Sequence, residues 1–271
     1  MGQVNNLISA FYRIRPGILV TQGTIQELPE KIKGEDLVLD VGGGLNPLSR
    51  ADYVLDFLPW EFGEKIEPKF RDIWPEPYFT KEKWIQHDIC SREKWPFEDK
   101  QFDFVYCSHT LEDIRDPIWV CQEIIRIGKA GYIETPSRII ESIKGIERTR
   151  YCGYYHHRWL CEINQNGIEF MFKPAQLHGY TRFHLTVGPS LSRNSNRYSW
   201  VGAFDPISNF FNIVNRWFRK INPKYSTIGM FWEGSFTFRE KLLIEKKDVE
   251  NDLMDFKKQS EKIPDLWIRK K

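Results

Sequence analysis

The sequence predicts an α/β fold, in which a doubly wound, Rossmann-like and mostly parallel sheet carries a C-terminal elaboration. Two observations lead to this prediction. Short apolar strands alternate with loops and a helix between Leu37 and Pro136, and the first strand ends at the glycine run Gly42–Gly44. Alternation of this kind is typical of a parallel sheet whose connections cover its faces. Such sheets bind ligands at the carboxyl ends of their strands, so we expect the functional site there.

Each predicted element has a local signal. Strands are expected where short apolar runs end at glycine, proline or an acid, and helices where apolar residues share one side. An Asn-Gly pair between two strand-like runs predicts a hairpin. The expected strands are residues 37–41, 53–56, 84–88, 102–107, 131–135 and a long strand over 230–244, the hairpin joins residues 158–163 to 168–173, and the helices are residues 118–127, 209–221 and 248–262.

The composition describes a globular protein with balanced charge. There are 39 Lys and Arg residues and 37 Asp and Glu residues, and this net charge of +2 argues against a dedicated nucleic-acid binder, which usually has a basic excess. No apolar run reaches the roughly 18 residues that a membrane helix needs. Arg13, Arg15 and Pro16 interrupt the N-terminal apolar stretch, so no signal peptide is predicted. Five cysteines without framework spacing indicate reduced thiols, and we expect a cytoplasmic location.

Asp40 stands two residues before the glycine turn Gly42–Gly44. Glycines after a strand let the backbone approach a ligand closely and supply amide donors. Dinucleotide folds follow G-x-G-x-x-G and usually have an apolar residue in place of the acid, whereas this turn reads G-G-G-L-N-P. An acid at this point faces a cationic ammonium group better than a pyrophosphate. The charge pattern therefore favours an amino-acid-bearing nucleoside over a dinucleotide.

Two more acids close the next two predicted strands. Asp56 can accept hydrogen bonds from two ribose hydroxyls. Asp88 is placed to accept from an adenine amino group, and the apolar Ile89 can lie against the ring. Taken singly, each acid would more often be a solvated loop residue. Three acids at the ends of three successive strands point instead to one binding site.

With these residues, the sequence resembles the class I S-adenosylmethionine-dependent methyltransferases over about residues 35–140. The segment 131–137 is similar to the fifth strand of a bacterial subgroup that often lies near cell-surface glycan genes. The motifs that carry the resemblance are Leu37–Gly44, His87–Ile89, Trp95–Phe97, Phe102–Val105, Ser108–Asp113 and Asp116–Pro117.

The resemblance implies S-adenosylmethionine as the cofactor and assigns roles to individual residues. The glycine turn and Asp40 would line the methionine and ribose part, Asp56 would take the ribose hydroxyls, and Ser108 and His109 would flank the methionine moiety and the methyl group. The full set of predicted cofactor-binding residues is Asp40, Gly42, Gly43, Gly44, Asn46, Asp56, Asp88, Ile89, Ser108 and His109.

The sequence pattern, together with the resemblance over about residues 35–140, divides the chain into three segments of one domain. Residues 1–34 are an N-terminal arm that we expect to cover the domain, residues 35–140 are the cofactor-binding core, and residues 141–271 are an acceptor-side elaboration with the remaining strands. Two features depart from the family pattern. Only residues 45–51 separate the glycines from the next strand, where the family has a helix, and Asp113 replaces the histidine of the common Leu-Glu-His.

Transfer to a hydroxyl acceptor usually needs a base, a metal or both. His109 is the best-placed base, since an imidazole of pKa about 6.5 can accept a proton at neutral pH; the alternative is a histidine that only forms a hydrogen bond or packs on the cofactor. Glu112 and Asp113 are weaker candidates, because acids at a helix start usually act as caps. Glu134 either points at the acceptor or is a structural acid.

His156 and His157 are further catalytic candidates. Aromatic residues flank them, and aromatic faces suit sugar rings or other planar acceptors; the alternative is a polar lip on a hairpin. Cys152 and Cys161 would complete a zinc set, but the C-x₈-C spacing is poor for zinc, so no metal is predicted. The basic and aromatic stretch 193–224 is interpreted as an amphipathic surface rather than a nucleic-acid interface.

The leading hypothesis is therefore an S-adenosylmethionine-dependent methyltransferase that modifies a hydroxyl of a sugar or small metabolite. Its partner is a small-molecule or glycan acceptor, with no nucleic acid, and the sequence makes no prediction of oligomeric state. One alternative is a nicotinamide-dependent oxidoreductase, which the absent G-x-G-x-x-G and Asp40 disfavour. The other alternative is a non-catalytic scaffold of the same fold. Two departures from the family pattern keep it possible, namely the short segment that follows Gly44 and the aspartate at position 113.

Overall fold

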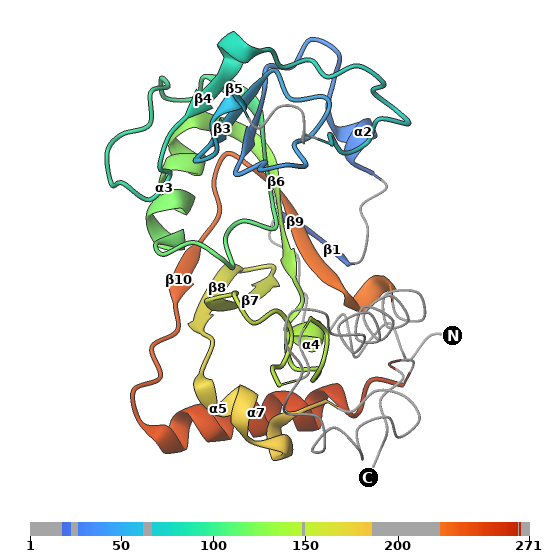
Figure 1. Cartoon of the computed structure of the whole chain (residues 1–271), viewed down its shortest axis with the longest axis vertical. Coiled ribbons are helices and arrows are strands. Elements are labelled where there is room, and N and C mark those ends of the chain that lie inside the picture. The colour runs from blue at the N-terminus through green and yellow to red at the C-terminus, as the bar shows by residue number, and fades with distance from the viewer. Residues whose placement is uncertain are drawn as a thin grey trace.

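The computed structural model describes residues 18–22, 27–61, 67–147, 150–185, 223–264 and 266. A seven-stranded sheet occupies one half of the molecule, and a three-stranded sheet with several short helices and one long helix occupies the other half (Figure 1). Residues 1–17 of the predicted N-terminal arm, the helix predicted at 209–221 and most of the basic and aromatic stretch lie outside the described residues. No helix within the described ranges is long and apolar enough to cross a membrane.

The main sheet has the strand order β1-β9-β6-β5-β2-β3-β4. The five strands from β6 to β4 are parallel, whereas β9 runs antiparallel to both β6 and β1. This confirms the predicted α/β fold. The strands are β1 (Ile18–Gln22), β2 (Val38–Val41), β3 (Tyr53–Asp56), β4 (Trp84–Gln86), β5 (Phe102–Ser108), β6 (Gly128–Pro136) and β9 (Thr227–Glu233).

The strand order reverses between β2 and β5. From β2 the chain adds β3 and β4 on one side, and it then returns to place β5 and β6 on the other. In open parallel sheets the carboxyl ends beside such a reversal form a crevice that binds ligands. β1 comes from the predicted N-terminal arm and pairs with β9 at the far edge, so part of this arm is built into the sheet.

The helix α3 (Pro117–Ile127) connects the parallel strands β5 and β6, as predicted. The side chain of Asp116 caps it by accepting from the amide of Trp119 at 3.0 Å, and Pro117 occupies the first turn, where no amide donor is needed. Its buried face, which includes Val120 and Ile124, packs into the apolar cluster beneath the sheet.

Aromatic side chains take the place of helices on the other connections. Residues 42–52, all of them described, contain no helix, as the short spacing suggested. The insertion after β3 contributes Trp60 and Phe79, whose rings lie edge-to-face with Trp84 at centroid distances of 5.7 and 6.0 Å. Together with Leu28 of α2 (Leu28–Lys31), these rings belong to the apolar cluster on the second face of the sheet. The short η2 (Lys81–Lys83) precedes β4 and buries no residue. Much of the aromatic content is therefore core.

A second sheet has the order β10-β8-β7. β7 (Trp159–Asn164) and β8 (Gly167–Phe172) form the predicted hairpin. The predicted strand over residues 230–244 is wrong, because β9 ends at Glu233 and β10 (Phe238–Glu240) pairs with β8 in the other sheet. Gly234, at a φ of +70°, turns the chain between them. The alternation of apolar residues continues across this turn, so periodicity alone did not show the break.

The helices of the second half pack around a buried cation. The elements are α4 (Arg138–Glu141), α5 (Ala175–Gly179), η3 (Thr181–Phe183), η5 (Pro223–Tyr225) and the predicted terminal helix α7 (Lys246–Ser260). Arg138 is buried, and its guanidinium bonds Glu162 on β7 and Asp252 on α7. One side chain of α4 thus joins the second sheet to the terminal helix.

We expect Arg138→Met to lower the free energy of unfolding by about 3 kcal/mol, because it leaves Asp252 partly buried without its main partner. The matched control is Arg239→Met, which removes an ion pair to Glu169 from an arginine side chain that is 78% exposed and should cost less than about 1 kcal/mol. Urea unfolding of both variants measures the difference. Equal losses would contradict the role assigned to Arg138.

Candidate active site

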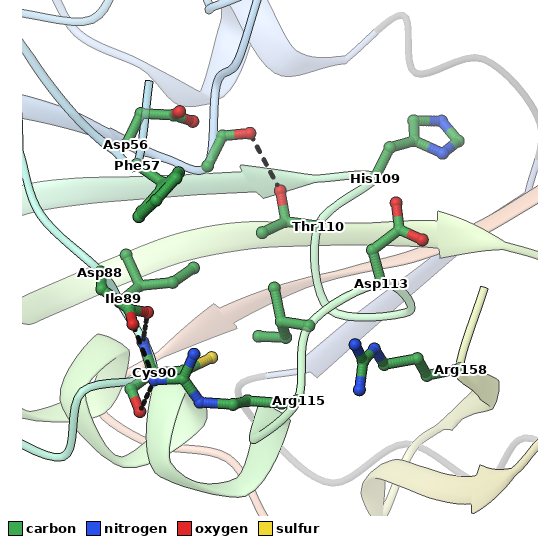
Figure 2. A pocket seen from close by; sticks show the side chains of 12 residues that line it. Asp56, Phe57, Asp88, Ile89, Cys90, His109, Thr110, Asp113, Arg115 and Arg158 are labelled. Carbon is green, nitrogen blue, oxygen red and sulfur yellow. Dashed lines mark hydrogen bonds and ion pairs between the residues drawn. The ribbon is translucent and has the colours of Figure 1, made fainter. Parts of the chain in front are cut away.

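A pocket of about 440 Å³ opens at the carboxyl ends of the parallel strands, beside the reversal of strand order. Figure 2 shows Asp56, Phe57, Asp88 and Ile89 along one side and Asp113 with Arg158 toward the other. Its volume lies within the roughly 300–1,000 Å³ of small-molecule sites. The lining residues are Gly42, Asp56, Phe57, Asp88, Ile89, Cys90, His109, Thr110, Asp113, Ile114, Arg115 and Arg158.

The glycine turn forms the part of the pocket next to β2. Gly42 and Gly44 have φ angles of +73° and +55°, which favour glycine. A Cβ on Gly42 would lie 2.3 Å from Thr110, whose hydroxyl donates to the carbonyl of Gly42 at 3.1 Å. The absence of a side chain therefore allows the loop after β5 to close against the turn.

Asp40 lies beneath the turn and does not line the pocket. Its Oδ2 accepts from the amide of Leu48 at 2.6 Å, and the residue is 1% exposed. Burial raises the pKa of Asp40 to about 7. In this structure Asp40 holds the backbone of the turn in place, and its predicted contact with the cofactor stays a prediction.

Asp56 ends β3 and lines the pocket. Its two oxygens accept from the amides of Gly44 at 2.8 Å and Leu58 at 2.7 Å, and the carboxylate has further acceptor sites. Burial raises the pKa of Asp56 above its ordinary value. The ring of the neighbouring Phe57 is 68% exposed and also lines the pocket. Sequence reasoning missed Phe57, although an aromatic residue after a strand-ending acid was a usable signal.

Asp88 and Ile89 line the same pocket, as predicted for one binding site. Asp88 accepts from the guanidinium of Arg115 at 2.7 Å and from the amide of Cys90 at 3.0 Å. Burial alone would raise the pKa of Asp88, but the hydrogen bonds from Arg115 and the amide of Cys90, together with the charge of Arg115, lower it. Arg115 was not identified from the sequence, because its partner lies 27 residues away along the chain.

His109 lines the pocket with its backbone at a φ of +56°. Its Nδ1 lies 3.5 Å from Glu112, and its Nε2 lies 3.3 Å from Glu134. Burial alone would lower the pKa of His109, but these two carboxylates raise it to about 9. The imidazole is therefore held as a cation at neutral pH, and the expected role as general base, which remains a prediction, has no support in this geometry.

Ser108 and Glu134 form a polar network behind His109. Glu134 accepts from Ser108 at 3.2 Å and from the hydroxyl of Tyr132 at 3.0 Å. Burial alone would raise the pKa of Glu134, but His109 outweighs it and lowers the pKa. Lys69 donates to the hydroxyl of Ser108 at 3.3 Å. This network fixes the loop after β5, and Glu134 is satisfied within it.

His156 and His157 lie next to the pocket and face one of its lining residues. Their Nε2 atoms are 3.7 and 3.9 Å from the carboxylate of Asp113. His157 is buried and bonds Glu141 through Nδ1, whereas the side chain of His156 is 45% exposed. Cys152 and Cys161 are buried free thiols, and no cysteine belongs to the convergent histidine group in the described ranges.

The pocket brings together five of the predicted cofactor residues, namely Gly42, Asp56, Asp88, Ile89 and His109. The other five are not among its lining residues. Asn46 is exposed and donates to the carbonyl of Glu67 at 3.1 Å. The remaining four are Asp40, Gly43 and Gly44, which belong to the β2 end and the turn itself, and Ser108, which lies behind His109.

The sequence was compared with known families and structures. Residues 63–133 match the methyltransferase domain family. This match supports the resemblance to class I methyltransferases, and it indicates S-adenosylmethionine as the cofactor. It covers β4, β5, α3 and most of β6. The comparison with curated proteins gave no match.

Several solved structures resemble part of the chain. A chain of the complex between the Haloferax volcanii Trm112 methyltransferase activator and a methyltransferase is 20% identical, with 39% of this chain and 47% of that chain covered and a TM-score of 0.29. A methyltransferase from Aquifex aeolicus is 17% identical, with 41% and 65% covered and a TM-score of 0.29. One from Mesorhizobium loti is 15% identical, with 54% and 64% covered and a TM-score of 0.30. The chain thus spans less than two thirds of each.

Two glycines of the turn, Gly42 and Gly44, have positive φ angles and make a matched pair for substitution. Alanine at a positive φ costs about 1 kcal/mol at Gly44, where a Cβ would meet nothing within 4 Å. We expect Gly42→Ala to cost at least about 1 kcal/mol more, since its Cβ also collides with Thr110. Urea unfolding measures both. Thr110→Ala should recover part of the loss at Gly42 and none at Gly44; equal costs at the two glycines would refute the close contact.

The buried Asp40 makes stability depend on pH. Because burial raises its folded-state pKa from 3.8 to about 7, its protonated form favours folding, and that contribution is lost as the pH rises from about 4 to about 7. Asp40→Asn stays neutral and still accepts from Leu48. We therefore expect the unfolding free energy of Asp40→Asn, relative to that of the native protein, to increase by up to about 4 kcal/mol as the pH is raised from 4 to 8. Parallel curves of unfolding free energy against pH would show that Asp40 is not perturbed.

Proposed function

We propose that the protein transfers the methyl group of S-adenosylmethionine to a hydroxyl of a sugar or small metabolite. The observation that carries this proposal is the pocket beside the β2–β5 reversal, where Gly42, Asp56 and Asp88 converge in a chain that contains a methyltransferase domain. A crevice of this kind, with acids at the strand ends, suits a nucleoside with a cationic amino-acid arm. The five cysteines are free, which agrees with a cytoplasmic location.

The lining residues suggest how the cofactor lies. Asp56 has capacity left for a ribose hydroxyl, because backbone amides do not use all the acceptor sites of a carboxylate. The exposed ring of Phe57 and the side chain of Ile89 offer apolar contact for adenine. The methionine end would then lie near Gly42 and His109, at the end of the pocket that faces Asp113.

In this reaction the methyl group passes directly from the cofactor to the acceptor, and no covalent bond to the protein is formed. The acceptor oxygen attacks the methyl carbon in line with the carbon–sulfur bond, that bond breaks, and its electrons stay on sulfur as S-adenosylhomocysteine forms. The protein has to align the two reactants and exclude water. His109 is cationic at neutral pH, so the acceptor proton must leave by another route. Glu112 and Glu134 offset the charge of His109 beside a cationic cofactor.

Aromatic residues next to the pocket support a ring-shaped acceptor. Tyr151 and Tyr155 are 40% and 46% exposed, with ring centroids 5.8 Å apart. Tyr155 lies edge-to-face on His156, which in turn faces Asp113 of the pocket wall. Flat, partly exposed rings with polar groups at their edges suit a sugar ring, which has apolar faces and hydroxyl edges.

Calorimetric titration with S-adenosylmethionine, S-adenosylhomocysteine and NAD tests the cofactor. We expect the first two ligands to bind and NAD not to bind. Asp56→Asn should weaken S-adenosylmethionine binding by about tenfold or more, since hydrogen bonds to a charged group are lost. The matched control is Asp103→Asn, which changes an acid that accepts the amide of Leu37 at the start of β5, away from the pocket, and should leave the affinity unchanged.

Binding of NAD alone would favour a nicotinamide-dependent oxidoreductase. If Asp56→Asn binds S-adenosylmethionine as tightly as the native protein, the proposed placement of the ribose is wrong. Urea unfolding of both variants controls for damage to the turn, since Asp56 also holds the amide of Gly44.

A further inference from the structure

Three side chains beside the pocket turn one ligand atom each toward a common point. The Nε2 atoms of His156 and His157 lie 3.7 Å from Oδ2 and 3.9 Å from Oδ1 of Asp113, and the three groups offer ligand atoms within 4.8 Å of one another. Ligands at about 2.0–2.1 Å from a tetrahedral zinc ion are roughly 3.3 Å apart. We propose that Asp113, His156 and His157 bind a divalent transition-metal ion of the zinc type.

The outer partners of both histidines support this assignment. The Nδ1 of His157 lies 2.8 Å from Glu141, and the Nδ1 of His156 lies 3.2 Å from Glu147. Metal-binding histidines usually donate their second ring N–H to a carboxylate, which fixes the tautomer. With Nδ1 held in this way, the lone pair of each Nε2 faces Asp113. Glu141 is itself fixed by the buried ammonium of Lys173.

One carboxylate oxygen at this point lacks a hydrogen-bond partner. The buried Oδ1 of Asp113 has none among the described residues, whereas the neighbouring Glu112, whose side chain is 2% exposed, is paired with His109 at 3.5 Å. Buried charges in proteins are normally paired or coordinate a metal. Without a metal, protonated histidines would pair with these acids, and Glu141 does raise the pKa of His157 although burial opposes it. Titration with a metal ion distinguishes the metal-bound site from these metal-free ion pairs.

The donor set decides which ion fits. Two imidazoles and one carboxylate suit zinc, iron or cobalt, whereas magnesium and calcium prefer oxygen ligands only. Three protein ligands also leave a coordination position open, as in catalytic rather than structural zinc sites. The sequence analysis considered zinc on Cys152, His156, His157 and Cys161, whereas here the third ligand beside the two histidines is Asp113, from the loop after β5.

The location gives the site a role that rests on the proposed function. Asp113 lines the pocket, so the open position faces the space for the acceptor. A hydroxyl oxygen bound there would lose its proton to water at a lower pH than in solution. Its oxygen would then attack the methyl carbon, and the electrons of the carbon–sulfur bond would pass to sulfur. This activation replaces the base that His109, as a cation, does not provide.

Titration of the chelator-treated full chain with Co²⁺ tests the site, since cobalt bound to imidazole and carboxylate has visible absorption bands. We expect one ion per chain, displaced by Zn²⁺. Asp113→Asn and His156→Gln should each weaken binding by more than about tenfold, and Glu147→Gln by about tenfold. Both ligand changes affect partly exposed side chains, so the fold should survive; His157 is buried and is left intact.

His87→Gln is the matched control, because this half-buried histidine follows β4 and is not part of the convergent group. It should bind Co²⁺ as the native protein does. Equal affinity in the native protein and in both ligand variants, or no binding of Co²⁺ or Zn²⁺ at micromolar concentration, would overturn the proposal in favour of metal-free ion pairs. Titration of the same samples with S-adenosylmethionine keeps the outcomes apart, because the metal site stands if only cofactor binding fails.

Discussion

Two carboxylates hold the glycine turn by its backbone amides, and the rest of the pocket depends on this interaction. Asp40 accepts from Leu48 and Asp56 accepts from Gly44, so both ends of a turn without a helix are fixed to neighbouring strands. A helix following the turn would supply amides and a dipole at the ligand. Here Asp40 and Asp56 hold the backbone of the turn in position instead. Burial of the Asp40 carboxylate destabilises its charged form, which is why its pKa is raised.

The loop after β5 is the second half of the same arrangement. Thr110 closes it against Gly42, the ring of His109 is held between Glu112 and Glu134, and Asp113 lies close to the histidines of the second half. The loop therefore connects the glycine turn with the two histidines of the second half. The network of Ser108 and Glu134 keeps its start rigid, which a reaction that depends on alignment requires.

Buried polar contacts link the second half of the chain to the loop after β5. Its hairpin is tied to the loop after β5 through the amides of Arg158 and Trp159, which donate to the carbonyl of Glu112. Arg138 joins the hairpin to the terminal helix. These buried polar links place the pair His156 and His157 beside Asp113, more than 40 residues away along the chain, and they make the proposed metal site a property of the whole fold.

The sequence by itself determined the parallel strands, α3, the hairpin and the terminal helix, because apolar periodicity and turn residues are local signals. It also placed Asp56, Asp88 and Ile89 at one edge, since strand ends of a parallel sheet meet there. Only the tertiary structure decided that Asp40 lies under the turn, that two acids make His109 a cation, and that Asp113 meets two distant histidines. Burial and long-range charge pairs depend on contacts between segments far apart in the chain, and no local pattern records them.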